Sequence, residues 1–193
     1  MADEPKWLWV DIRDDNLKKA KARSYLEPLS ALGQGVIRDD NDDDDTLMFS
    51  STYLGRPYRA KVAWHCGDPV KLMVKVNNER GRLDVERKLD AGPLQPEPRD
   101  AFDDDPPKVR YFIGPGTYIE DEQSEAERQL AMLTPIASGL ILQLMQVTDT
   151  EFLRLEDDML TLRYRAHVTL LDLVRQVQMS FELIQPIGRE LGF

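Results

Sequence analysis

Residues 134–147, T-P-I-A-S-G-L-I-L-Q-L-M-Q-V, form the most apolar stretch of the chain and contain no charged residue. Thr134 before Pro135 predicts a helix start, because threonine caps free amides and proline at the first helical position loses no hydrogen bond. Apolar residues then recur at helical spacing: Ile136, Leu140, Ile141, Leu144 and Met145. Leu142 and Val147 extend the apolar surface round the helix, so we expect most of it to be enclosed.

Gly139 lies inside this predicted helix, where glycine costs about 1 kcal/mol relative to alanine. Close approach by another element would explain its presence. The apolar run is shorter than the ~20 residues that cross a bilayer. We therefore predict the central helix of a soluble core and no membrane partner.

The composition is that of an ordinary globular protein. The 193 residues, 41% hydrophobic and 31% charged, predict a single domain over residues 1–193. The first residues, M-A-D-E-P-K, lack the basic start and apolar region of a secretory signal. The lone cysteine, Cys66, excludes a disulfide within the chain and suits a reducing compartment. We therefore expect the protein to be cytoplasmic.

Two acidic runs carry the whole negative excess of the chain. Residues 39–45 contain six aspartates and no basic residue, and residues 90–105 contain six acidic residues and one arginine. The net charge is −10, so the rest of the chain is close to neutral. Such runs are solvated and self-repelling, which predicts an acidic loop at 39–45 and a Pro/Asp-rich loop at 91–108.

The first half of the chain predicts a helix followed by an antiparallel meander. Residues 7–12, W-L-W-V-D-I, have the composition of a strand. A helix should run from Asn16 to about Leu32, shortened or kinked by Pro28. Its predicted inner residues are Leu17, Ala20, Leu26 and Leu29. Four strand signals, separated by turn-rich segments, follow at residues 46–54, 58–66, 70–76 and 82–89.

Alternation assigns the two faces of this predicted sheet. One face is apolar and contains Tyr58, Ala60, Val62, Trp64, Cys66, Val70, Leu72, Val74, Val76, Leu83, Val85 and Leu89. The opposite face is mostly basic, with Lys61, Lys71 and Lys75 among its residues, and offers no aromatic side chain on these strands. We expect a half-buried sheet with a solvated basic face.

The second half predicts two hairpins and two helices. The hairpins comprise residues 109–119 and 151–165, and a capping box at 124–127 starts a helix that runs into Pro135. A last helix begins near Val168, carries an apolar stripe, and should stop or bend at Pro186. Together these elements predict a single α+β domain. Its mainly antiparallel sheet, of about six to eight strands, would be packed by the central and C-terminal helices beside an N-terminal helix.

Acidic residues assemble no convincing metal or catalytic site in the sequence. Asp39, Asn41 and Asp43 have the first spacings of an EF-hand loop. However, Asp44 replaces its turn glycine and Ser50 its bidentate glutamate. The pair at 157–158 has the composition of a turn, because aspartate is a common turn former.

Nucleophile, zinc, phosphate and nucleic-acid sites also lack support. His65 and Cys66 point to opposite faces of a strand, and His167 has no visible partner. Two histidines and one cysteine do not suffice for a histidine/cysteine zinc site. The G-P-G at 114–116 lacks the spacing and the lysine of a P-loop. Overall acidity opposes binding to a polyanion, so we predict no cofactor, no metal and no nucleic-acid partner.

These observations favour a non-enzymatic binding protein of the adaptor, inhibitor or immunity type. Its acidic runs would engage a basic surface of another protein. The candidate contact residues are Asp42, Asp43, Asp44, Asp45, Asp103, Asp104 and Asp105. One alternative is a structural subunit of an oligomer, and self-association suits this reading. Another is an enzyme or small-ligand sensor with a pocket between sheet and helices.

Overall fold

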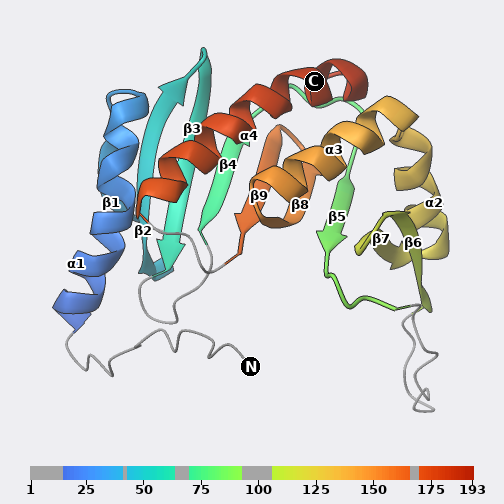
Figure 1. Ribbon diagram of the computed structural model, residues 1–193, viewed down its shortest axis with the longest axis horizontal. Helices are drawn as coiled ribbons and strands as arrows, with labels where there is room; N and C mark the ends of the chain where they lie inside the picture. The colour runs from blue at the N-terminus through green and yellow to red at the C-terminus, as the bar shows by residue number, and fades with distance from the viewer. Residues whose placement is uncertain (1–14, 41–42, 64–69, 93–105, 166–169) are drawn as a thin grey trace.

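The computed structural model describes residues 15–40, 43–63, 70–92, 106–165 and 170–193. Nine strands form one sheet, and every pairing in it is antiparallel (Figure 1). The predicted α+β class is confirmed, with one strand more than the upper end of the expected number. The predicted strand at residues 7–12, His65, Cys66 and His167 lie outside the described residues.

The helices and strands follow one another in a simple order. The first half contains α1 (Asp15–Leu26), the 3-10 helix η1 (Glu27–Leu32), β1 (Val36–Asp40), β2 (Asp43–Tyr53), β3 (Arg56–Ala63), β4 (Lys71–Lys75) and β5 (Leu83–Arg87). The second half contains β6 (Lys108–Gly114), β7 (Thr117–Glu122), α2 (Gln123–Met132), α3 (Pro135–Val147), β8 (Thr150–Glu156), β9 (Met159–Tyr164) and α4 (Leu170–Leu191).

The strand order is β1-β2-β3-β4-β9-β8-β5-β7-β6. β2, β3 and β4 pair in succession as the predicted meander requires, but β5 pairs with β8 and β7. The β8–β9 hairpin therefore separates β4 from β5. Its five inward-facing apolar residues are at most 1% exposed, as suits a central position in the sheet: Leu153, Leu155, Leu160, Leu162 and Tyr164.

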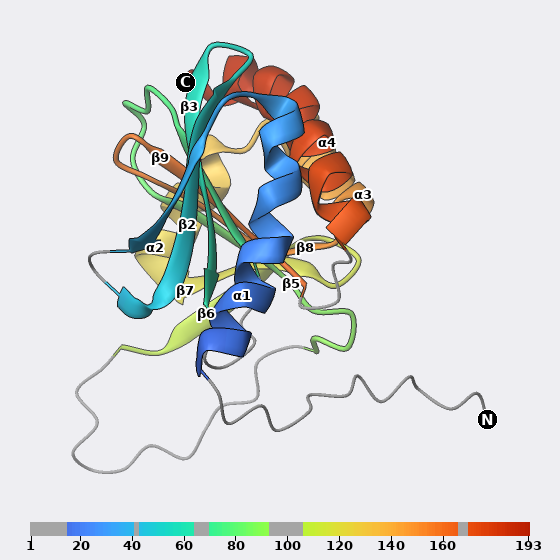
Figure 2. The same ribbon diagram turned by 90° about the vertical axis from the view of Figure 1, so that its left-hand side faces the viewer.

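Three helices cover one face of the sheet. α3 and α4 lie side by side across it, and α1 packs against β2 and β3 on the same side (Figures 1 and 2). We call this the covered face. The opposite side of the sheet, which we call the open face, carries exposed residues such as Arg38 and Lys71. α2 packs at the end of the sheet, against β6 and β7.

Apart from Leu89, the described residues that alternation assigned to the inner face are buried in the core; Trp64 and Cys66 lie outside the described residues. Leu72, Val74, Leu83 and Val85 are completely buried. Leu89 is 67% exposed and corrects the predicted set, because β5 already ends at Arg87. Strand alternation therefore identifies the core only as far as the strand itself extends.

The central run forms α3, as predicted, and begins with the predicted cap. The Thr134 hydroxyl accepts a hydrogen bond of 3.0 Å from the Ala137 amide. Only one side of the helix is buried, however, through Ala137, Ile141, Leu144 and Met145. Ile136 is 62% exposed, so the expected enclosure is wrong.

Gly139 also corrects an expectation. A Cβ atom at this position would meet no atom within 4 Å, so no other element approaches it closely. α3 lies in an outer layer of the fold, and residues on its outer side lack neighbours. Among the described residues no single helix meets the length and composition that crossing a membrane requires; α2 and α3 do so only as a pair bent by 97°.

Two prolines lie in helical segments near the ends of the chain and have different effects. Pro28 marks the change from α1 to the tighter η1, as the predicted shortening implies. Leu26 and Leu29 are buried, whereas Leu17 is 55% exposed and Ala20 is also exposed, because at 3.6 residues per turn both point away from the side of α1 that Leu26 occupies. Pro186 lies inside α4 without ending it.

The described residues of the first acidic run, predicted as a loop at 39–45, belong to β1 and β2, and residues 41–42 lie outside the described residues. Asp39 and Asp40 end β1, and Asp43 begins β2. Asp39 forms an ion pair with Lys19, and Asp40, 5% exposed, lies 2.5 Å from Lys61. Local ion pairs therefore neutralise part of the run, which allows strand pairing despite the charge density. Most of the predicted loop at 91–108 lies outside the described residues, and Lys108 starts β6.

Candidate binding groove on the open face

One cross-strand row of side chains runs over the open face through all nine strands. Register places its members opposite one another in pairs: Arg38, Met48, Lys61, Lys71, Arg163, Phe152, Glu86, Tyr118 and Phe112. The half of the row on β1–β4 and β9 is basic, and the half on β5–β8 is largely aromatic. The side chains of the row therefore change from mainly basic to mainly aromatic at the centre of the sheet.

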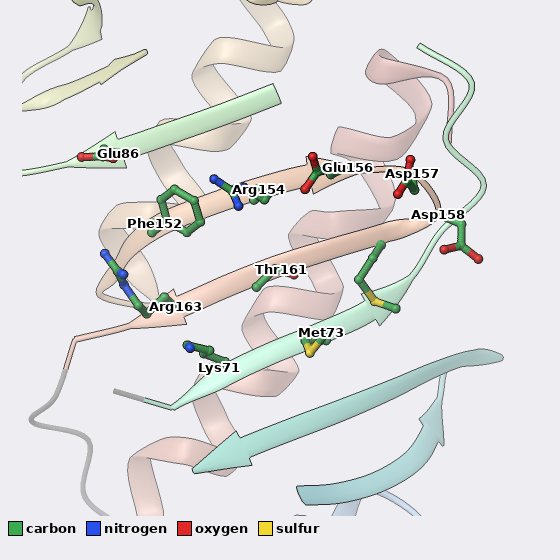
Figure 3. A pocket seen from close by; sticks show the side chains of 11 residues that line it. Lys71, Met73, Glu86, Phe152, Arg154, Glu156, Asp157, Asp158, Thr161 and Arg163 are labelled. Carbon is green, nitrogen blue, oxygen red and sulfur yellow. The ribbon is translucent and has the colours of Figure 1, made fainter. Parts of the chain in front are cut away.

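A groove of about 660 Å³ lies at this change, across β4, β9 and β8. Its lining combines charged residues with Phe152, two methionines and a threonine (Figure 3). The lining residues are Lys71, Met73, Glu86, Phe152, Arg154, Glu156, Asp157, Asp158, Met159, Thr161 and Arg163. Its position on the open face differs from the expected pocket between sheet and helices.

Phe152 forms the aromatic centre of the groove. The guanidinium carbons of Arg154 and Arg163 lie 5.1 Å and 5.2 Å from the centre of its ring. These distances are within the range in which the negative face of an aromatic ring attracts a cation. The ring therefore holds two arginines at fixed positions while remaining partly exposed itself.

Arg154 is committed to the protein's own structure. It donates two hydrogen bonds to the Asp84 carboxylate, of 2.8 Å and 2.9 Å, and Arg82 donates two more. Hydrogen bonding to Asp84 raises the pKa of both arginines. The Asp84 backbone amide donates a hydrogen bond to the side chain of Gln129 in α2, so the cluster also contacts that helix.

Lys71 and Arg163 form the basic end of the groove. They are cross-strand partners on β4 and β9, and Figure 3 shows them at one end of the lining. Arg163 lies 2.8 Å from Glu151 through Nε, while its side chain is 41% exposed. Within the described residues Lys71 forms no ion pair. This end therefore retains a positive charge that a ligand can neutralise.

Glu156, Asp157 and Asp158 form the opposite, acidic end (Figure 3). Asp157 and Asp158 make the turn between β8 and β9, as predicted, and Asp157 has a positive φ of 50°. Asp158 lies 3.4 Å from Lys75, which offsets part of its charge. No ion pair is found for Glu156 or Asp157 within the described part of the chain.

Beyond the groove, the open-face row continues with Tyr118, which is only 3% exposed, and with the exposed Phe112. Tyr118 donates a hydrogen bond of 3.1 Å to Glu86, and Arg110 lies 4.2 Å above its ring. Burial, followed by the nearby Glu86 carboxylate, raises the pKa of Tyr118 to about 12, so its hydroxyl stays a donor at neutral pH. Phe112 packs edge-on against Tyr118 and is 46% exposed.

None of the described residues in the sequence-predicted contact set lines this groove. Asp43, Asp44 and Asp45 belong to β2, and Asp42 and the three aspartates at 103–105 lie outside the described residues. The expected absence of outward aromatic residues is confirmed for the described parts of β3, β4 and β5, but it does not extend to the rest of the open face. Phe152, Tyr118 and Phe112 occupy it, on strands that the sequence analysis did not assign to the same sheet face.

A signal for the groove was present in the sequence. If Leu153 and Leu155 point inward, then Phe152 and Arg154 must point outward, and the same alternation on β9 places Arg163 outward. The residues of the groove follow from this pattern, but their meeting requires the order β4-β9-β8. Within the described residues, the groove included, no group of three or more histidine, cysteine, aspartate or glutamate side chains could hold a metal ion.

Comparisons with known proteins establish a likeness of fold. No protein-family model matches the chain, and no curated protein matches it in sequence. Among solved structures, it resembles the crystal structure of the mycobacterial trehalose monomycolate transport factor A, TtfA. The TM-score is 0.57 at 10% sequence identity, over 88% of this chain and 95% of that chain. At this identity, the likeness shows that the two chains share a fold and extends no further.

Proposed function

We propose that the chain is a non-enzymatic binding protein and that another protein docks on the open face, with an acidic group between Lys71 and Arg163. The observation that carries this proposal is the groove itself. It combines a partly exposed aromatic ring with a basic end, where Glu151 offsets part of the charge of Arg163 and Lys71 forms no ion pair within the described residues.

Residue type supports binding to a protein rather than a reaction. Arginine, aromatic residues and methionine are enriched at protein interfaces, and arginine is frequent among residues whose loss weakens binding most. Ring contacts fix Arg163 in advance, so less side-chain entropy is lost on binding. The remaining polar groups near Phe152 are held by internal partners, an arrangement that favours recognition.

Nucleic acid remains the less favoured partner, because of the charge of the groove and of the chain rather than a lack of aromatic residues. The open face does offer aromatic residues for stacking. However, the acidic end of the groove and the net charge of −10 both oppose a polyanion. A protein segment can carry the mixed charges that such a groove requires. The expected cytoplasmic residence stays a prediction.

Site-specific photo-crosslinking in the natural host tests the proposal. A photoreactive benzoylphenylalanine at Met73, inside the groove, is compared with the same residue at the exposed Gln143 on α3. We expect a protein adduct from position 73 only, and its loss when Lys71→Glu and Arg163→Glu are added. Lys71→Glu alone is a milder variant, since Arg163 also lies beside Glu151.

Two results would overturn the proposal. One is the absence of any protein adduct from position 73 in a folded protein. The other is an adduct that forms equally from position 143 or persists after charge reversal at Lys71 and Arg163. Circular dichroism of each variant establishes that the protein being crosslinked retains its fold.

A further inference from the structure

Oppositely charged residues stand at the two ends of the groove; Arg163 already pairs with Glu151, whereas Lys71, Glu156 and Asp157 form no ion pair within the described residues. Lys71 and Arg163 lie at one end, and Glu156 and Asp157 at the other (Figure 3). Arg163 and Met159 are four residues apart on β9, and Glu156 faces Met159 across the hairpin. At a rise of roughly 3.3 Å per strand residue, the two ends are about 13 Å apart.

The floor between these ends is apolar apart from Thr161 and from Arg154, which faces Thr161 on β8 and is bonded to Asp84. Met73 and Thr161 are cross-strand partners in the middle, with Phe152 and Met159 on either side. A bound segment should therefore present an apolar patch between two charges of opposite sign. Methionine side chains adapt to ligands of different shape, which suits such a floor.

The sheet dictates the conformation of the bound segment. β4, β9 and β8 are central strands, and each pairs with a neighbour on both sides. Their backbone amides and carbonyls are thus already bonded within the sheet. A segment lying on this face gains no backbone hydrogen bonds from it and must satisfy its own, as a helix does.

Resting on the proposed function, we propose that the partner contributes an amphipathic helix that bears an acidic and a basic residue two turns apart. Positions separated by seven or eight residues share one helix face and lie roughly 11–12 Å apart at 1.5 Å per residue. The acidic residue contacts Lys71 and Arg163. The basic residue contacts Glu156 and Asp157, and apolar residues one turn inward cover Met73 and Phe152.

Four fluorescently labelled, alanine-rich helical peptides test this inference in solution. The first carries Glu at position i, Leu at i+3 and i+4, and Lys at i+7. The second and third carry two Glu or two Lys at the outer positions, and the fourth places Glu and Lys on opposite helix faces. Binding to the full chain is measured by fluorescence anisotropy at low and high salt.

We expect the first peptide to bind roughly three- to tenfold more tightly than the others, because it forms both exposed ion pairs. Changing one end of the groove should then change the preference. Lys71→Glu with Arg163→Glu makes both ends acidic and should favour the two-Lys peptide. Glu156→Lys with Asp157→Lys makes both ends basic and should favour the two-Glu peptide.

The outcomes separate this inference from the proposed function. Equal binding of all four peptides, or an unchanged preference in either folded double variant, overturns the helix inference. Failure of every peptide to bind, while the crosslinked adduct at position 73 still forms, also overturns it and leaves the groove as the docking surface. Loss of both the peptide preference and the adduct overturns the two together.

Discussion

The same strand alternation places apolar residues on the covered face of the sheet and mostly charged residues on the open face. On the covered face, apolar residues such as Leu72 and Leu162 are fully buried under the helices. On the open face, their neighbours Lys71 and Arg163 remain partly exposed, and Arg163 is held by a ring contact and an ion pair. Stability should therefore depend mainly on the first set, while the second can change with little cost to the fold.

The largest effect should come from charge placed under the helices. Leu144 on α3 is completely buried, so Leu144→Asp places an unpaired carboxylate in the core at a cost of several kcal/mol. This is a large part of the ~5–15 kcal/mol that stabilises a typical domain. We expect no soluble, cooperatively melting protein in expression and thermal denaturation assays.

Gln143, the preceding residue, is the matched control. Its side chain is exposed, so Gln143→Asp should change the free energy of unfolding by no more than about 0.5 kcal/mol. A Leu144→Asp protein that melts within a few degrees of the parent would show that the covered face does not determine stability.

Removing one tyrosine hydroxyl group from each face should give smaller changes in the free energy of unfolding. On the covered face, Tyr164 and Ser180 share a buried hydrogen bond of 2.8 Å. Tyr164→Phe leaves the serine without this partner and should cost about 1–3 kcal/mol in urea unfolding, whereas adding Ser180→Ala should restore part of the loss. On the open face, Tyr118→Phe should cost less, because water can reach the half-buried Glu86. Equal costs would remove the distinction.

Alkaline pH provides a property in which the two faces should agree. Burial is the leading cause that raises the pKa of Tyr58, on the covered face, and of Tyr118, on the open face, to about 12 from 10.0. The folded state keeps each proton longer than the unfolded chain does. Their stabilising contribution is complete below pH 10 and decreases as the pH rises towards 12.

Urea unfolding at pH 8, 10 and 11 measures this decrease. Tyr58→Phe and Tyr118→Phe should each make the fall in unfolding free energy with pH shallower than in the parent. A variant whose pH dependence above 10 matches the parent would show that its tyrosine hydroxyl is not shielded in the folded state.

The sequence predicted the covered face better than the open one, for a physical reason. Burial selects apolar residues at period two or 3.6, and that pattern can be read locally, as for Leu72 and Val74 on β4. The cap at Thr134 is equally local. Errors arose where an apolar residue has no neighbour to cover it: Ile136 lies on the outer side of α3, and Leu89 follows the end of β5.

The open groove could not be predicted because it depends on strand order. Lys71 and Arg163 are far apart in the sequence and meet only because the β8–β9 hairpin enters between β4 and β5. Charge counting was misleading for a related reason. Asp40 belongs to an acidic run in the sequence, but in the fold it is a buried partner of Lys61.

The smallest effect on stability should come from the acidic runs, whose binding role remains a prediction. Replacing residues 42–45, or 103–105, with Asn keeps their size and removes charge. If these residues attract a basic surface on the partner, association at low salt should slow. The change should shrink near 0.5 M salt, where the Debye length is only a few ångströms. Stopped-flow kinetics with the partner that crosslinking identifies measures the association rate at both salt concentrations.

Charge reversal at Lys71 and Arg163 is the matched comparison. Lys61 is unsuitable as a control, because reversing it would place a second acid beside the buried Asp40. Groove variants should act mainly on dissociation, since they remove close contacts, whereas loss of the acidic charges should act on association. Kinetics that respond to the groove and ignore both acidic runs would assign binding to the open face alone, and the acidic-run hypothesis would be wrong.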